Sequence, residues 1–326
     1  MEDLKTMIFG PVPSRRLGQS LGINNIQPKV CTYSCIYCQV GKTPNLTIIR
    51  KPFYLPETIL KQVIKKVEEV ITKDCRVDYL TFVPDGEPTL DINLGKELSL
   101  LEQVGIPKAV ITNASMMCCE DVMEDLLEAD FISLKIDAVS KDIWKKVDRP
   151  HKDLELNIIL EGIMEFSKVF KGTLVSETML IDGINYNGEI EKIADFLKHL
   201  KKLNKAYVAI PTRPPVEKWV KPAKEPVLNT AVQTFSKSLG ANRVEYLIGY
   251  EGNAFACTGR VREDLLAITA VHPMRREAVK EFLKKTDSSW SIIEKLLQEA
   301  KLVELEYQEK VYYVRKLPSR TETNNM

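Results

Sequence analysis

Residues 77–112, VDYLTFVPDGEPTLDINLGKELSLLEQVGIPKAVIT, contain one complete strand, helix and strand unit. The run from Val77 to Val83 is short and apolar, which is typical of a buried strand. An amphipathic stretch follows at 92–104, and the next apolar run extends from Ala109 to Thr112. Strands that alternate with helices predict a parallel sheet with right-handed crossovers.

The same alternation extends from about residue 18 to residue 250. The other apolar runs are Ser20 to Ile23, Phe131 to Ile136, Thr173 to Leu180 and Tyr207 to Ile210, and the other helical stretches are 56–73, 119–128, 154–169, 188–203 and 227–239. Six such units predict an α/β fold with an open, partial (β/α)6 barrel, because closure needs eight. Val244 to Ile248 is a further candidate for an edge strand.

The C-terminal part has a different pattern. Residues 260–318 predict three helices followed by a hairpin, in which Leu302 to Tyr307 and Lys310 to Val314 alternate in polarity. This order is typical of a winged helix. We therefore expect a barrel domain at 1–255, a winged-helix-like domain at 260–318 and a frayed tail at 319–326.

Composition excludes several classes of protein. Of 326 residues, 44% are hydrophobic and 28% are charged, which is ordinary for a globular protein and excludes collagen, coiled coils and long disorder. The 46 basic and 45 acidic residues leave a net charge of +1, too low for a protein coated with nucleic acid. No apolar run approaches the roughly 20 residues of a membrane span, and the N-terminus lacks the features of a signal peptide. We expect a cytoplasmic protein with no membrane partner.

Three of the seven cysteines lie together in Cys31-Thr-Tyr-Ser-Cys35-Ile-Tyr-Cys38, in a loop just after the first predicted strand. Structural zinc needs four Cys or His ligands, and the chain has only three histidines. A disulfide between two of the thiols is disfavoured in a reducing compartment. Three thiolates suit a four-iron cluster with one iron left open, which a substrate or cofactor can chelate.

The spacing C-x3-C-x2-C, with an aromatic residue before the last cysteine, resembles the radical S-adenosylmethionine (SAM) superfamily. That resemblance implies a [4Fe-4S] cluster on Cys31, Cys35 and Cys38, with SAM on the open iron and Tyr37 near the adenine. It also implies reductive cleavage of SAM to methionine and a 5′-deoxyadenosyl radical. The electron would come from a donor such as flavodoxin or ferredoxin, and the site would lie at the C-terminal ends of the barrel strands.

Four further segments resemble one branch of this superfamily: GPVPSRRLGQSLGIN before the cysteines, QVGK after them, DGEPTL at 85–90 and DRPH at 148–151. The branch includes tRNA 4-demethylwyosine synthase, of wybutosine biosynthesis, and uncharacterised iron–sulfur oxidoreductases. That synthase carries a second cluster on upstream cysteines, whereas no cysteine precedes Cys31 here. The difference argues against the tricycle-forming reaction and leaves the SAM-cleaving core untouched.

Polar residues at strand ends are candidates for binding SAM. Gly86 allows close approach of the backbone, and Glu87 matches the family's Gly-Glu motif, whose carboxylate accepts from the SAM ammonium group. Asn113 follows the third strand and suits a ribose or a carboxylate, although a turn or helix cap is an equal alternative.

Two later strands add further candidates. Ser133, Lys135 and Asp137 share one face of a strand, and they are expected to contact ribose and substrate, or to form a structural Lys135–Asp137 pair. Lys135 is also a candidate for a Schiff base with a carbonyl substrate. On the next strand Thr178 is a candidate SAM contact, but the alternation leaves open which face looks inward.

Cys257 lies in a glycine-flanked loop after the last strand, where it is a candidate hydrogen donor, methyl carrier or cluster ligand, with an incidental thiol as the alternative. The leading hypothesis is a radical SAM enzyme that abstracts hydrogen from an unknown substrate, a tRNA base or a peptide. The alternative is an iron–sulfur or SAM-binding regulator that binds nucleic acid through its winged helix. Contact with a protein, nucleic acid binding and capping of the barrel all stay open as roles for residues 260–318.

Overall fold

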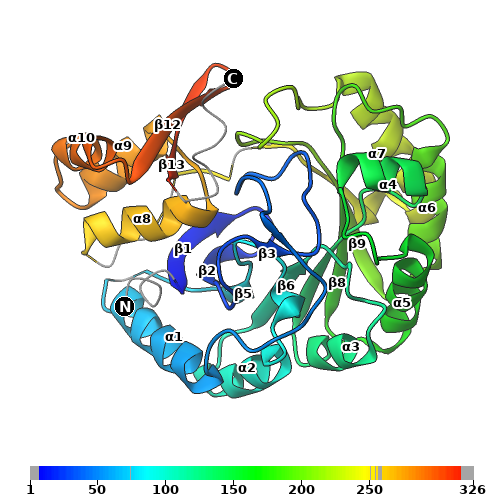
Figure 1. Ribbon diagram of the computed structural model, residues 1–326, viewed down its shortest axis with the longest axis horizontal. Helices are drawn as coiled ribbons and strands as arrows, with labels where there is room; N and C mark the ends of the chain where they lie inside the picture. The colour runs from blue at the N-terminus through cyan, green and yellow to red at the C-terminus, as the bar shows by residue number, and fades with distance from the viewer. Residues whose placement is uncertain (1–6, 74, 250, 254, 256–258, 317–326) are drawn as a thin grey trace.

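The computed structural model describes residues 7–73, 75–249, 251–253, 255 and 259–316, and its main element is one curved eight-stranded sheet (Figure 1). In spatial order the strands are β1 (Ile8–Ser14), β2 (Gly18–Ile23), β5 (Tyr79–Phe82), β6 (Lys108–Thr112), β7 (Phe131–Lys135), β8 (Thr173–Met179), β9 (Leu203–Ala209) and β10 (Val244–Leu247). β1 pairs antiparallel with β2, and every later pair is parallel. The predicted parallel α/β sheet and its edge strand β10 are confirmed.

Helices cover the outside of the sheet (Figure 1). They are α1 (Pro56–Ile71), α2 (Leu94–Leu101), α3 (Glu120–Leu126), α4 (Lys141–Val147), α5 (Leu156–Val169), α6 (Glu189–His199) and α7 (Glu225–Leu239). Short 3₁₀ turns lie at η2 (Pro88–Leu90), η3 (Glu102–Val104) and η4 (Ala241–Arg243). Two short strands, β3 (Val30–Cys31) and β4 (Asn45–Leu46), pair in parallel outside the main sheet. The main core lies between the outward faces of the strands and the apolar stripes of these helices.

Strand β1 and helix α4 are absent from the sequence prediction. β1 contains Gly10, Pro11 and Pro13, which argue against a strand because proline cannot donate to a sheet ladder. The strand is tolerated because it lies at the edge of the sheet, with β2 as its only neighbour in the sheet order. Helix α4 has only seven residues, too few to give a clear periodic signal.

The C-terminal elements pack against β1. They are α8 (Val261–Val271), β11 (Met274–Arg275), α9 (Arg276–Lys285), α10 (Ser291–Gln298), β12 (Leu302–Tyr307) and β13 (Lys310–Arg315), with the sheet order β11-β13-β12. Phe9 and Val12 of β1 share one buried cluster with Leu265 and Ile268 of α8. The expected helices and hairpin are present, whereas the winged-helix assignment and the domain limits stay predictions. The expected frayed tail lies outside the described residues.

Within the described part of the chain, no helix combines the length and the apolar character needed to cross a membrane.

Candidate active site

The inner surface of the sheet changes from apolar to polar along the strands. Phe131, at the start of β7, belongs to a small buried cluster with Val175 and Tyr207. Further along β7 the same face carries Ser133 and Lys135, as period-two alternation predicts. The polar end is where the strands finish, and the cysteine loop lies beside it because Cys38 and Lys135 line the same cavity.

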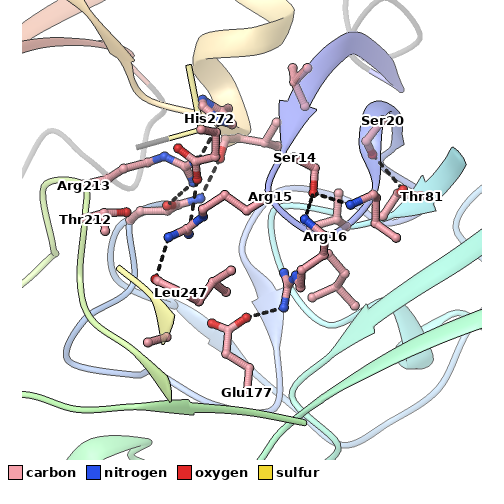
Figure 2. A pocket seen from close by; sticks show the side chains of 18 of the residues that line it. Ser14, Arg15, Arg16, Ser20, Thr81, Glu177, Thr212, Arg213, Leu247 and His272 are labelled. Atoms are coloured by element: carbon pink, nitrogen blue, oxygen red, sulfur yellow. Dashed lines mark hydrogen bonds and ion pairs between the residues drawn. The ribbon is translucent and has the colours of Figure 1, made fainter. Parts of the chain in front are cut away.

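A cavity of about 310 Å³ occupies this polar end (Figure 2). The charged and titratable residues in its wall come from several elements: Arg15, Arg16, Lys135, Glu177, Arg213, Glu251 and His272. Its volume is at the lower end of the range for ligand sites, roughly 300–1,000 Å³.

The three cysteines of the loop are free thiols with three different neighbours. Asn113 Nδ2 lies 3.6 Å from Cys31 Sγ, and Lys29 Nζ lies 3.5 Å from Cys38 Sγ. The Cys35 thiol points at Asp148 Oδ1, 3.5 Å away. Burial, with the nearby Glu87 carboxylate, raises the pKa of Cys31 to about 12. Nitrogen donors beside two of the sulfurs fit an iron–sulfur cluster, because such hydrogen bonds tune and orient thiolate ligands.

Zinc, the alternative to a cluster, would need its ligands gathered around one ion. Among the residues that the structure describes, no three His, Cys, Asp or Glu side chains are placed to share one metal ion. A four-iron cluster makes a different demand, because each thiolate binds a different iron.

Glu87 is fully enclosed and accepts hydrogen bonds at both carboxylate oxygens. Oε1 accepts from Thr112 Oγ1 at 2.5 Å and from Thr89 Oγ1 at 2.7 Å, and Oε2 accepts from Asn113 N at 2.8 Å. Burial raises the pKa of Glu87, and these donors oppose the rise. The carboxylate therefore ties the end of β5 to the end of β6, and Oε2 keeps acceptor capacity for a ligand.

Gly86 makes a close approach, but to protein backbone. A Cβ at this position would lie 1.9 Å from the Val30 carbonyl oxygen. Glu87 N also donates to that oxygen at 3.1 Å. Because Gly86 has no side chain, the backbone of the motif after β5 packs directly against β3, which contains Val30 and Cys31.

Asn113 contacts the cysteine loop directly. Its Nδ2 donates to Thr32 Oγ1 at 2.7 Å, and Ser115 Oγ donates to the same hydroxyl at 2.6 Å. Asn113 Oδ1 also accepts from Ser115 N, so the turn expected as one alternative is present, while the contact with a ribose or a carboxylate stays a prediction.

Lys135 lies within a network of charges next to the cysteine loop. Its Nζ is 3.0 Å from Glu177 Oε1, 3.8 Å from Asp137 Oδ1 and 4.7 Å from the centre of the Tyr37 ring. Tyr37 donates its hydroxyl to Asp137. Burial lowers the pKa of Lys135, but the charges of Asp137 and Glu177 outweigh it and raise the pKa above its ordinary value. The structural Lys135–Asp137 pair expected as one alternative is present.

Strand β8 presents Glu177 and Met179 to the cavity, which settles the face left open by the alternation. Thr178 points to the opposite side, where its Oγ1 donates to the Ile136 carbonyl at 2.8 Å. The structure therefore corrects the choice of Thr178 as the cavity-facing residue: adjacent residues of a strand project to opposite faces. Cys257 lies outside the described residues.

By sequence, the pair Arg15-Arg16 and Arg213, in the loop after the run Tyr207 to Ile210, fit a solvated surface and a contact with a ligand equally well, whereas no sequence pattern pointed to Glu251 or His272. All five line the cavity. Arg213 Nη2 donates to Glu251 Oε1 at 2.6 Å and contacts His272 Nε2 at 2.6 Å. Burial and the Arg213 charge lower the pKa of His272 to about 3. Only the positions of Arg213 and Glu251, after the ends of the predicted strands β9 and β10, could have indicated that these residues belong to the site.

Arg15 and Arg16 reach across the inside of the sheet. Arg15 Nη1 donates to the carbonyls of Leu247, at 2.5 Å, and Gly249, at 2.9 Å, and so links the end of β1 to the end of β10 at the opposite edge (Figure 2). Arg16 Nη1 donates to Ser133 Oγ at 2.9 Å and pairs with Glu177. The side chain of Arg15 therefore bridges the open side of the partial barrel, between its two edge strands.

Comparison with known proteins identifies the family. The family model of the Radical SAM superfamily matches residues 27–197, which include the cysteine loop, Glu87 and Asn113. The chain belongs to the radical SAM superfamily. This radical SAM chain is 50% identical, over 97% of its length and 98% of the relative's, to the UPF0026 protein MJ1312 of Methanocaldococcus jannaschii.

More distant relatives agree with this family. The S-adenosyl-L-methionine-dependent tRNA 4-demethylwyosine synthase of Saccharomyces cerevisiae is 28% identical over 52% of this chain and 22% of that protein. A radical SAM methyltransferase from Sphaerobacter thermophilus has a TM-score of 0.50 at 13% identity, covering 70% of this chain and 66% of that one, and so shares the fold. The predicted resemblance to the radical SAM superfamily, including the wyosine-synthase branch, is confirmed.

Proposed function

We propose that this radical SAM protein is an enzyme that cleaves SAM reductively at a [4Fe-4S] cluster held by Cys31, Cys35 and Cys38. The observation that carries the proposal is the placement of these three free thiols, with Cys38 in the wall of a cavity at the polar end of the barrel. A [4Fe-4S] cluster held by these cysteines would supply the electron for reductive cleavage of SAM to methionine and a 5′-deoxyadenosyl radical, which would abstract hydrogen from the substrate.

The residues around the loop would hold the bound groups. Lys29 and Asn113 donate toward the sulfurs of Cys38 and Cys31, and the free acceptor capacity of Glu87 Oε2 suits the SAM ammonium group. Tyr37 of the loop donates a hydrogen bond to Asp137, and Lys135 Nζ lies over the Tyr37 ring. A flavodoxin or ferredoxin is proposed as the electron donor, and tRNA and peptides are the first substrates to screen.

The test is anaerobic. The purified protein is reconstituted with iron and sulfide, SAM and dithionite are added, and 5′-deoxyadenosine is quantified over time. Cys35→Ala is expected to lose the cluster and the product. Cys75→Ala is the matched control, because that thiol contacts Lys73 and Lys285, away from the loop. A wild-type protein that holds about four irons and SAM without forming product would contradict the proposal and favour the regulator.

A further inference from the structure

The cavity wall carries more positive than negative charge. Four cationic side chains line it, from Arg15, Arg16, Lys135 and Arg213, against the two carboxylates of Glu177 and Glu251. Both carboxylates are ionised: burial raises their pKa, but Lys135 and Arg16 beside Glu177, and Arg213 beside Glu251, lower it to about 2 in each case. His272 is uncharged at neutral pH, since its pKa is about 3. Asp137, whose Oδ1 lies 3.8 Å from Lys135 Nζ, adds a third carboxylate beside the cavity, so one positive charge is left in excess.

Hydrogen-bond donors are left over as well. A guanidinium has five N–H groups in a fixed fork. Among the described residues, Arg16 hydrogen-bonds through Nη1 alone, so Nε and Nη2 are spare. Arg213 uses Nη1 on Gln39 and Nη2 on Glu251 and His272, while its Nε is buried without a partner in the described structure. An unmet buried donor is costly, and an acceptor from a ligand would relieve that cost.

The cysteine loop and the arginines line the same cavity. Tyr37 and Cys38 of the loop are in its wall, where SAM is proposed to bind, and Arg213 Nη1 donates to Gln39 Oε1 beside Cys38. The arginines come from the turn between β1 and β2 and from the loop after β9; Figure 2 shows Arg16 paired with Glu177 and Arg213 near His272, in the wall of the same cavity. Arginine forks match the planar oxygens of carboxylates and phosphates. The volume, about 310 Å³, limits the occupant to a small molecule or to one residue of a polymer.

We propose that Arg16 and Arg213 form an oxyanion subsite, which binds a carboxylate or phosphate group of the substrate inside the barrel. This inference rests on the proposed function, because it names the group by which the substrate of that same site is held. Arg15 has a different role. Its Nη1 donates to the backbone carbonyls of Leu247 and Gly249 at the opposite edge of the sheet, so it stabilises the cavity wall and does not bind the ligand.

The test measures binding of two probes, methyl phosphate and propionate, to the reconstituted protein by calorimetry. Saturating S-adenosylhomocysteine is present, which fills the SAM position and prevents either probe from binding there. We expect saturable binding of at least one probe, weakened about tenfold or more in Arg16→Gln and Arg213→Gln, because each loses a charge-assisted hydrogen bond. The tighter probe shows whether the natural group is a phosphate or a carboxylate.

Matched controls separate a local effect from a folding defect. Arg262→Gln removes an exposed arginine paired with Glu299 and should leave probe binding unchanged. Arg16→Lys keeps the positive charge and loses the fork, so it should restore part of the binding lost in Arg16→Gln. Absence of saturable binding, or an equal loss in Arg262→Gln, overturns the inference. Formation of 5′-deoxyadenosine from SAM alone is measured in parallel, so that the proposed function can stand while the oxyanion subsite fails, or the reverse.

Discussion

Gln39 Nε2 donates to the Val271 carbonyl at 3.0 Å, which joins the residue after the last cysteine of the loop to the end of helix α8. Gln39 Oε1 accepts from Arg213 Nη1 at 2.9 Å. Tyr307 and Tyr312 of the C-terminal hairpin donate to the carbonyls of Pro211 and Thr212, at 2.8 and 2.9 Å. The C-terminal elements therefore contact both the cysteine loop and the loop after β9 that contains Arg213. Among the three roles considered for residues 260–318, these contacts favour capping of the barrel.

Gln39→Met should destabilise the protein, because it leaves the Val271 carbonyl and Arg213 Nη1 without this partner. We expect the free energy of unfolding, measured with denaturant, to fall by about 1–3 kcal/mol. Gln103→Met is the matched control: it removes an exposed bond from Gln103 to the Leu100 carbonyl and should change stability by less than about 0.5 kcal/mol. Equal effects of the two substitutions would show that Gln39 does not link the two parts.

Gly86→Ala should be strongly destabilising, because the added Cβ would lie 1.9 Å from the Val30 carbonyl oxygen, a backbone atom that cannot swing aside. A loss of more than about 3 kcal/mol in the free energy of unfolding is expected. At Gly249 a Cβ meets nothing within 4 Å, so Gly249→Ala serves as the control and should stay within about 0.5 kcal/mol. Tolerance of Gly86→Ala would show that the contact with Val30 is not needed.

Glu87→Gln should lower stability although it conserves shape. The amide nitrogen of glutamine would face a backbone N–H, either that of Asn113 or that of Thr89. Two opposed donors in a buried site should cost about 1–3 kcal/mol in the free energy of unfolding. Glu124→Gln, at an exposed position of α3, is the control. A variant as stable as the control would contradict the role of Glu87 in joining β5 to β6.

Lys135 should not form a Schiff base, because its pKa is raised and the ammonium form has no lone pair for attack. After incubation with glyoxylate and cyanoborohydride, peptide mapping by mass spectrometry should find less modification at Lys135 than at the exposed Lys198. Preferential labelling of Lys135 would instead support a covalent role.

The low pKa of His272 makes stability depend on pH. The folded chain keeps this imidazole neutral down to about pH 3, whereas the unfolded chain takes up a proton near pH 6.5. Stability is therefore lost as the pH falls from about 6.5 toward 3. Between about pH 7 and pH 5 the neighbouring Glu251 keeps its charge in the folded chain, because its pKa is about 2, and protonation of His272 in the unfolded chain should cost the wild type about 2 kcal/mol.

His272→Gln isolates this contribution. The free energy of unfolding of the wild type, minus that of the variant, should decrease by about 2 kcal/mol when both are measured at about pH 7 and pH 5. The subtraction cancels titrations common to both proteins, including those of the buried Asp91 and Glu97, whose raised pKa values, about 7 and about 9, act in the opposite direction. A difference that does not change with pH would show that His272 titrates normally.

Much of the fold was predictable because its signals are local. The strands β2 and β5 to β10 alternate with amphipathic helices, and each of those periodicities is carried by consecutive residues. The inward face of β7 followed from the same rule. β1 could not be found in this way, because Gly10, Pro11 and Pro13 oppose a strand locally, and only its place at the sheet edge permits it.

By itself the sequence determined the cysteine loop, the alternation of strands and helices, and the motif at 85–90, since all three are short-range patterns. The tertiary structure decided which face of β8 looks inward, and it decided that Arg15, Arg213 and His272 meet in one cavity. These three residues are distant from one another in the chain, and no local pattern places them together. Only the curvature of the sheet and the packing of α8 on β1 bring them together, and that packing depends on contacts that no single segment encodes.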